Sequence, residues 1–141
     1  MKKPRNTGKK ANIISEKTTQ VIIGAFGAGK TQVQLVLRSG DGGEFYLCPE
    51  DGAIPRIKIG AEQESWDEVV AVLIHEIQEY LLTVSGCRYD PCNDMSNDHS
   101  AYVFIMNHTR FSDICAKTAM YINQALPRLR REWRNFKKQE G

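Results

Sequence analysis

Apolar and polar side chains alternate in short runs between residues 19 and 60, which is the pattern of β-strands. In the run TQVQLVLRS, Val33, Leu35 and Leu37 fall on one side, while glutamines and an arginine fall on the other. A strand that is buried on one face has this period of two residues. The runs TTQVIIGAFG, TQVQLVLRS, EFYLC and IPRIKIGA are separated by turn-forming residues and predict an antiparallel β-meander.

The hydrophobic period changes at Ser65, and the residues that follow predict a helix over 66–85. Ser65 and Glu68 fit a capping box, in which the serine accepts a hydrogen bond from the first turn and the glutamate reaches back. Gly86 is suited to a left-handed cap at the other end. The apolar residues have the spacing of one helix face and are Trp66, Val69, Val70, Leu73, Ile77, Tyr80, Leu81 and Val84.

A second helical pattern begins at about Thr109 and continues almost to the end of the chain. Its apolar side consists of Phe111, Ile114, Cys115, Thr118, Ile122, Ala125, Leu126, Leu129, Trp133 and Phe136. Pro127 lies inside this pattern and predicts a kink or a break. Between the helices, the polar segment 87–100 predicts a loop, and the run AYVFIM predicts one more strand. Together these elements predict an α+β fold, in which the sheet packs on the first helix and the long C-terminal helix backs that helix.

The length and composition of the chain favour a single domain. The chain has 141 residues with 41% hydrophobic content, and we assign the domain to residues 16–141. Residues 1–15 are rich in lysine and show no period, so we expect a flexible basic tail. No apolar run approaches the ~20 residues that cross a bilayer, and no apolar stretch follows the basic start as it does in a secretory signal. We therefore expect a cytoplasmic protein that has no membrane partner.

Lysine and arginine are unevenly distributed although the net charge is only +2. They gather in the first ten residues and in the segment 128–138. Basic ends can bind the phosphate backbone of nucleic acid, or they can be solvated ends that keep a small protein in solution. Nucleic acid is therefore one candidate partner.

The four cysteines are expected to be free thiols, because no secretory signal precedes them. Cys87, Cys92 and His99 also allow a small zinc knuckle. No second pair of ligands with matching spacing accompanies them, so free thiols are favoured.

The segment GAFGAGKT contains the letters of a phosphate-binding loop, with Gly24, Gly29, Lys30 and Thr31 at the required positions. Such a loop must open a helix, because the N-terminal amides of that helix hold the phosphates. The residues after Lys30 instead alternate like a strand, and no later hydrophobic strand ends in a magnesium-binding aspartate. The segment therefore predicts a glycine-rich hairpin turn without a nucleotide.

A histidine and two glutamates, His75, Glu76 and Glu79, interrupt the largely apolar helix segment VLIHEIQEYLL. His75 and Glu79 lie one turn apart on the side opposite the main apolar stripe. Their neighbours on that side include Ala71 and Leu82, so we expect the C-terminal helix to cover it. Buried charges need partners. Either a metal ion binds both side chains, or His75 and Glu79 simply pair with each other across one turn.

The same segment resembles the HExxH motif of zincin-type metallopeptidases, and specifically small phage-like proteins with a short sheet, an HExx[HE] helix and a backing helix. The resemblance covers residues 72–82 and, more loosely, the stretch FIMNHTRF that introduces the last helix. Where the motif has its second histidine this chain has Glu79, so a third ligand has to come from elsewhere. The two other histidines are His108 and His99, and we favour His108 because it lies between a predicted strand and the start of the backing helix.

The resemblance implies a zinc ion held by His75, Glu79 and His108, which are the ligand types of thermolysin-like sites. Glu76 would be the base that takes a proton from the zinc-activated water. We therefore expect a zinc-dependent, peptidase-like hydrolase that acts on a peptide or protein. The alternative is a non-enzymatic, phage-type accessory or inhibitor protein that binds a protein or nucleic-acid partner.

Overall fold

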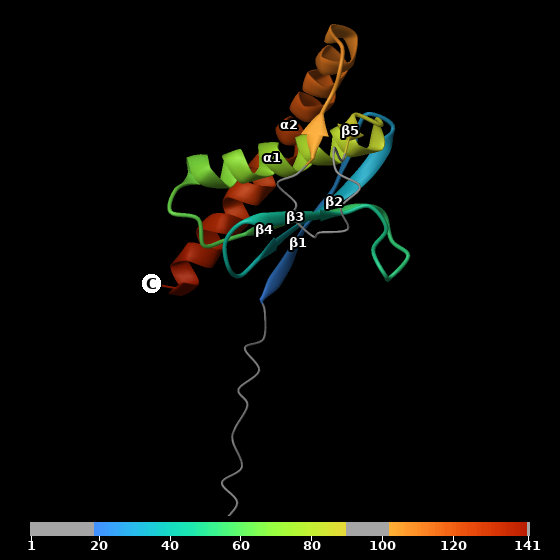
Figure 1. Cartoon of the computed structure of the whole chain (residues 1–141). Coiled ribbons are helices and arrows are strands. Elements are labelled where there is room, and N and C mark those ends of the chain that lie inside the picture. The colour runs from blue at the N-terminus through green and yellow to red at the C-terminus, as the bar shows by residue number, and fades with distance from the viewer. Residues whose placement is uncertain (1–18, 90–101, 141) are drawn as a thin grey trace, which may run out of the picture.

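The computed structural model of the chain describes residues 19–89 and 102–140, and its fold is α+β, as predicted (Figure 1). Along the chain the elements are β1 (Gln20–Ala28), β2 (Thr31–Arg38), β3 (Gly43–Tyr46), β4 (Arg56–Gly60), α1 (Trp66–Val84), β5 (Arg88–Tyr89), β6 (Val103–Phe104) and α2 (His108–Glu140). The expected basic tail lies outside the described residues, as do Cys92 and His99.

The four-stranded sheet has the order β1-β2-β4-β3. β1 pairs antiparallel with β2 and β3 pairs antiparallel with β4, but β2 and β4 run parallel. The prediction of an antiparallel meander is therefore wrong at this point, because β4 lies between β2 and β3. Ile57 and Ile59 of β4 are fully buried, whereas the side chains of the short β3 are partly or fully exposed. The inner position allows β4 to bury both of its isoleucines, and the short strand β3 is left at the edge.

Gly29 and Lys30 form the tight turn between β1 and β2. Gly29 has a φ of 67°, a left-handed conformation that glycine adopts without steric cost. Thr31 begins β2, so a strand rather than a helix follows Lys30. The prediction of a hairpin turn in this segment, with a strand after Lys30, is confirmed.

Both helices pack on the same face of the sheet, and α2 crosses α1 (Figure 1). The fully buried residues of this core include Val33, Leu35, Leu37, Ile57 and Ile59 from the sheet, Val69, Leu73 and Ile77 from α1, and Tyr121, Ala125 and Leu129 from α2. Hydrogen bonds from α2 to the strands and to the residue after β4 also hold the helix in place, and two of them come from its aromatic side chains. The Tyr121 hydroxyl donates to the Val33 carbonyl (3.2 Å), and the Trp133 ring N–H donates to the Ala61 carbonyl (3.0 Å).

The ends of α1 lie where the sequence predicted them. The Ser65 side chain accepts a hydrogen bond from the Glu68 backbone N–H (3.2 Å), and the Glu68 carboxylate accepts one from the Glu64 backbone N–H (2.9 Å). Gly86, with a φ of 73°, follows the C-cap residue Ser85. These caps satisfy backbone groups that a helix end leaves without partners, so they hold the helix that carries the polar trio.

α2 is one helix of 33 residues that continues through Pro127. The sequence predicted either a kink or a break at this proline, and the helix is not broken there. Pro127 lies on the exposed side of α2, where water can reach the backbone carbonyl that a proline leaves unbonded. Asn107 caps the start of the helix, because its side-chain oxygen accepts a hydrogen bond from the Arg110 backbone N–H (2.8 Å). Neither described helix has a stretch that is long and apolar enough to cross a membrane.

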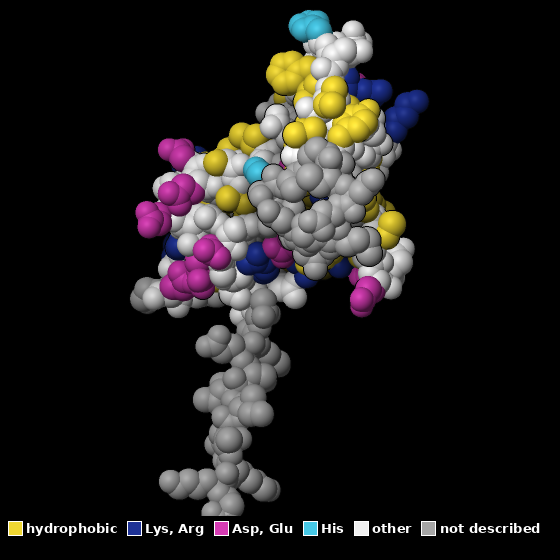
Figure 2. Space-filling model, in the orientation of Figure 1, with side chains coloured by type: hydrophobic (Ala, Val, Ile, Leu, Met, Phe, Trp, Pro, Cys, Tyr) yellow, Lys and Arg dark blue, Asp and Glu magenta, His cyan; other side chains and the backbone are white. Residues whose placement is uncertain are grey.

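β5 and β6 form a separate two-stranded antiparallel sheet beside α1. Hydrophobic side chains gather on its outer side and over the start of α2 (yellow, upper part of Figure 2). The exposed large hydrophobic residues of this region include Tyr89, Val103, Ile105 and Phe111. Because side chains alternate along a strand, Tyr102 and Phe104 point to the opposite side, toward the body of the protein.

Candidate metal centre

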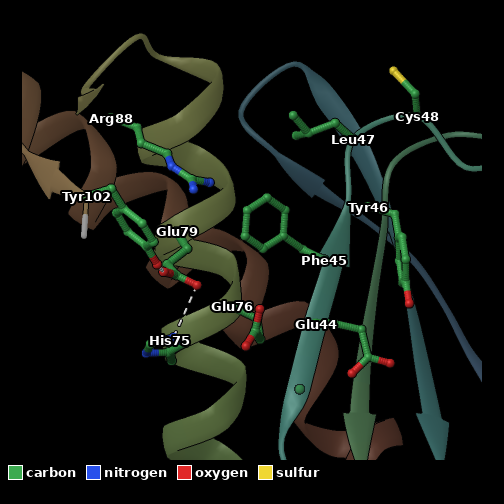
Figure 3. Close-up of a pocket in the computed structure, with 11 residues that line it drawn as sticks. Glu44, Phe45, Tyr46, Leu47, Cys48, His75, Glu76, Glu79, Arg88 and Tyr102 are labelled. Carbon is green, nitrogen blue, oxygen red and sulfur yellow. Dashed lines mark hydrogen bonds and ion pairs between the residues drawn. The ribbon is translucent and has the colours of Figure 1, made fainter. Parts of the chain in front are cut away.

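The structure brings His75, Glu76 and Glu79 together in the middle of α1 (Figure 3). Nε2 of His75 lies 3.1 Å from Oε2 of Glu79, one helical turn away. One potential ligand atom from each of the three residues lies within 4.8 Å of those of the other two. These residues form a group that could hold a metal ion.

The side of α1 that carries His75 is open, which corrects the prediction that the C-terminal helix covers it. Ala71 is exposed, and 63% of the His75 side chain is accessible to solvent. α2 packs against the main apolar stripe instead, where the rings of Trp133 and Trp66 lie 5.7 Å apart between centroids. The reason is that the stripe offers large side chains to both the sheet and α2, whereas Ala71 adds little apolar surface. The predicted site buried between the two helices is therefore not formed, since His75 is exposed.

The site lies instead on the wall of an open pocket between α1, β3 and the two-stranded sheet (Figure 3). The pocket has a volume of about 650 Å³. It is lined by Gly43, Glu44, Phe45, Tyr46, Leu47, Cys48, His75, Glu76, Glu79, Arg88 and Tyr102. A second hollow of about 400 Å³, which is lined by Gly42, Gly43, Ala71 and Val72, is also lined by His75 and Glu76. These two side chains therefore face both hollows.

Glu76 is buried although it lies next to the exposed His75. Only 5% of Glu76 is exposed, because its side chain points from α1 toward β3 (Figure 3). Burial raises the pKa of Glu76 from 4.5 to about 7; the neighbouring His75 opposes this rise, while Glu79 and Glu44 add to it. A carboxyl group with such a pKa exchanges its proton near neutral pH.

Both carboxylate oxygens of Glu79 are engaged. Oε2 faces His75, and Oε1 accepts a hydrogen bond from the Tyr102 hydroxyl. The Arg88 guanidinium lies 4.0 Å from the centroid of the Tyr102 ring. The hydrogen bond to Glu79, together with burial, raises the pKa of Tyr102 above its ordinary value. Glu79 is thus held from both sides, with 15% of its side chain exposed.

His108 does not join this group within the described part of the chain. It is the first residue of α2 and is exposed. The first turns of α2 project beyond α1 (upper part of Figure 1). His99, the other histidine considered for this role, lies outside the described residues. A third ligand from either histidine stays a prediction.

Sequence reasoning missed Tyr102, Arg88 and the close approach of β3 at Gly43. Tyr102 belongs to the run AYVFIM, which was predicted as a strand, but nothing in that run indicates its partner. Arg88 and Phe104 are cross-strand partners that the intervening segment separates in the sequence. The short runs CRY and YVF contain the residues of β5 and β6. Runs of three residues are too short for the sequence to predict that these strands pair.

The free cysteines expected from the sequence are present where the structure describes them, at Cys48, Cys87 and Cys115. Cys87 is buried, while Cys48 and Cys115 are exposed. The alternative, a zinc knuckle, needs Cys92 and His99, and both of these residues lie outside the described part of the chain.

Comparison with known proteins adds no family to this description. No protein-family model, no curated protein and no solved structure matches the chain.

Proposed function

We propose that this protein is a metal-dependent hydrolase that acts on peptide-like substrates. The observation that carries the proposal is the position of Glu76. This buried carboxyl group, with a pKa of about 7, lies beside the His75–Glu79 pair on the wall of an open pocket. A proton acceptor matched to neutral pH, adjacent to two potential metal ligands, is an arrangement suited to activating water.

The donor atoms fit a transition-metal ion. Ligand bonds of 2.0–2.2 Å in a tetrahedral site place neighbouring ligand atoms about 3.4 Å apart. The atoms of His75 and Glu79 are already 3.1 Å apart, and that of Glu76 lies within 4.8 Å of both. One imidazole and carboxylate oxygens suit zinc, and they also suit iron and manganese. We propose zinc because of the resemblance of the α1 segment to the zincin motif.

The three residues His75, Glu76 and Glu79 would have different roles in hydrolysis. A divalent cation bound there would polarise a substrate carbonyl and acidify water. His75 and Glu79 would hold the cation, with a further ligand from His108 or His99. The Glu76 carboxylate would accept a proton from the attacking water and pass it to the leaving nitrogen.

A peptide is the proposed substrate because β3 is an edge strand. β3 pairs only with β4 in the four-stranded sheet, and its residues line the pocket next to the trio. A strand edge binds extended peptides through main-chain hydrogen bonds. The two hollows share the lining residues Gly43, His75 and Glu76, which supports an extended substrate that passes these side chains.

The test is metal content together with peptide hydrolysis. The purified full-length chain should contain about one zinc ion per molecule or take it up, which mass spectrometry of the metal measures. It should cleave members of a quenched-fluorescence peptide library, and removal of the metal by a chelator should abolish cleavage. Glu62→Gln, an exposed carboxylate outside the pocket, is the control that should retain both properties. A stable protein that takes up no metal and cleaves no peptide would refute the proposal.

The alternative function is a non-enzymatic protein that binds an acidic partner or nucleic acid. The observation that favours it is the last part of α2, where Arg128, Arg130, Arg131, Arg134 and Lys138 are all exposed. Phosphate contacts by such side chains make binding strongly dependent on salt. Binding of a labelled DNA duplex that weakens steeply with salt, by a metal-free and inactive protein, would favour this alternative.

A further inference from the structure

The two oxygens of Glu79 make different contacts. Oε2 lies 3.1 Å from Nε2 of His75 and therefore faces the second potential ligand. Oε1 accepts the hydrogen bond of the Tyr102 hydroxyl on the opposite side. We infer that Tyr102 is a positioning residue for the metal site, because it holds Oε1 of Glu79 and leaves Oε2 as the single atom offered to a metal ion. This inference rests on the proposed metal-binding function and deepens it.

Tyr102 can act in this way because its ring is held in place. The Arg88 guanidinium lies over the ring at 4.0 Å, and the Phe104 ring packs against it at 5.3 Å between centroids. Arg88 and Phe104 are directly opposite each other on β5 and β6. The backbone hydrogen bond from Ile105 to Cys87 (2.9 Å) extends this pairing. The two-stranded sheet thus fixes the hydroxyl against α1.

The chemical consequence concerns how the carboxylate coordinates. A carboxylate can bind a metal through one oxygen or through both, and a free glutamate side chain also loses rotational freedom when it binds. A hydrogen bond that occupies Oε1 of Glu79 favours metal coordination through Oε2. It also restricts the rotation of the Glu79 side chain before a metal ion binds. Such outer contacts orient the ligand, and their loss typically weakens metal affinity by about 10- to 100-fold.

A purely structural role of Tyr102 is the competing explanation. In that case its hydroxyl only docks the two-stranded sheet on α1. Loss of the hydroxyl would then lower the melting temperature but would not change the affinity of the folded protein for metal. The two explanations therefore differ in metal affinity, which can be measured without any substrate.

The experiment compares Tyr102→Phe with Tyr89→Phe in the full-length chain. Phenylalanine keeps the ring that packs on Arg88 and Phe104 and removes only the hydroxyl. Tyr89 lies on β5 of the same small sheet and is exposed, so its variant controls for the loss of a tyrosine hydroxyl. Zinc affinity is measured by competition with a chromophoric chelator, and the coordination is followed by the visible spectrum of the cobalt-substituted protein.

We expect Tyr102→Phe to bind zinc about 10- to 100-fold more weakly than wild type and to change the cobalt spectrum. Tyr89→Phe should match wild type in both measurements. If Tyr102→Phe binds zinc as tightly as wild type, with an unchanged cobalt spectrum, the inference is overturned while the proposed metal site stands. If wild type binds neither ion, the proposed function and the inference both fall.

Discussion

The backbone of Gly43 in β3 lies directly against the side chain of Glu76 in α1. A methyl group added at Gly43 would come within 2.9 Å of Cγ of Glu76 and within 2.8 Å of Cγ1 of Val72. Cβ atoms in proteins essentially never lie so close to another heavy atom, so the side chains of Val72 and Glu76, or the strand itself, would have to shift. The missing side chain of Gly43 therefore allows the edge strand to bury the carboxyl group of Glu76.

We expect Gly43→Ala to lower the pKa of Glu76 from about 7 toward the ordinary value of 4.5, because water would reach the carboxyl group. The overpacked strand should also destabilise the protein by about 1–3 kcal/mol. Backbone strain adds nothing here, since Gly43 is not among the glycines with a positive φ. A carbon-13 NMR titration of the Glu76 carboxyl group and urea unfolding measure the two effects.

Gly27→Ala is the matched control for this change. A Cβ at Gly27 would meet no atom closer than 3.7 Å, which is ordinary contact. This variant should leave the pKa of Glu76 unchanged and cost little stability. An unchanged Glu76 pKa in Gly43→Ala as well would show that the strand does not cause the burial.

The free energy of unfolding of the metal-free protein should fall as pH rises from about 4.5 to 7. The pKa of Glu76 is about 7 in the folded protein against an ordinary value of 4.5, so the folded state keeps a proton that the unfolded chain has already lost. The stability linked to this proton is fully present below pH 4.5 and lost above pH 7, and it amounts to at most about 3 kcal/mol. Urea unfolding of wild type and Glu76→Gln near pH 5 and pH 8 measures it. Glu76→Gln should lack this decrease, and an equal decrease in both proteins would argue against a buried Glu76.

His75→Ala and Glu76→Gln should separate binding from catalysis. His75→Ala should abolish metal uptake. It should change stability by no more than a few tenths of a kcal/mol, because the side chain is largely exposed and Glu79 keeps its bond to Tyr102. Glu76→Gln should retain the metal and the fold, while peptide hydrolysis falls by about 100- to 10,000-fold. If Glu76→Gln loses the metal, Glu76 is itself a metal ligand, and its distance from His75 and Glu79 also permits that role.

Tyr121→Phe should affect stability without affecting the site. Tyr121 is buried and its hydroxyl donates to the Val33 carbonyl at 3.2 Å, and Tyr121 does not line the pocket. Removing it should cost about 1 kcal/mol in urea unfolding. Metal affinity should equal that of wild type, and a large change there would mean that the site depends on the packing of α2.

The sequence by itself determined the two helices, the four strands of the larger sheet and the residues of the trio. Alternation predicted β2, and the same alternation excluded a phosphate-binding loop at Lys30. Ser65 and Gly86 marked the ends of α1, and the spacing of four residues placed His75 and Glu79 one turn apart. Each of these features depends on residues close together in the chain, where backbone geometry alone relates one side chain to the next.

Only the tertiary structure decided which strands became neighbours and which side of α1 stayed open. β4 lies between β2 and β3, because Ile57 and Ile59 bury more apolar surface in that position. α2 packed on the large side chains of the main stripe, so His75 faces a pocket rather than a second helix. Tyr102 reaches Glu79 across 23 positions of the chain. Contacts of this kind depend on the total apolar surface that the whole chain buries when it folds. A local pattern of residues does not specify that total, so it cannot predict these contacts.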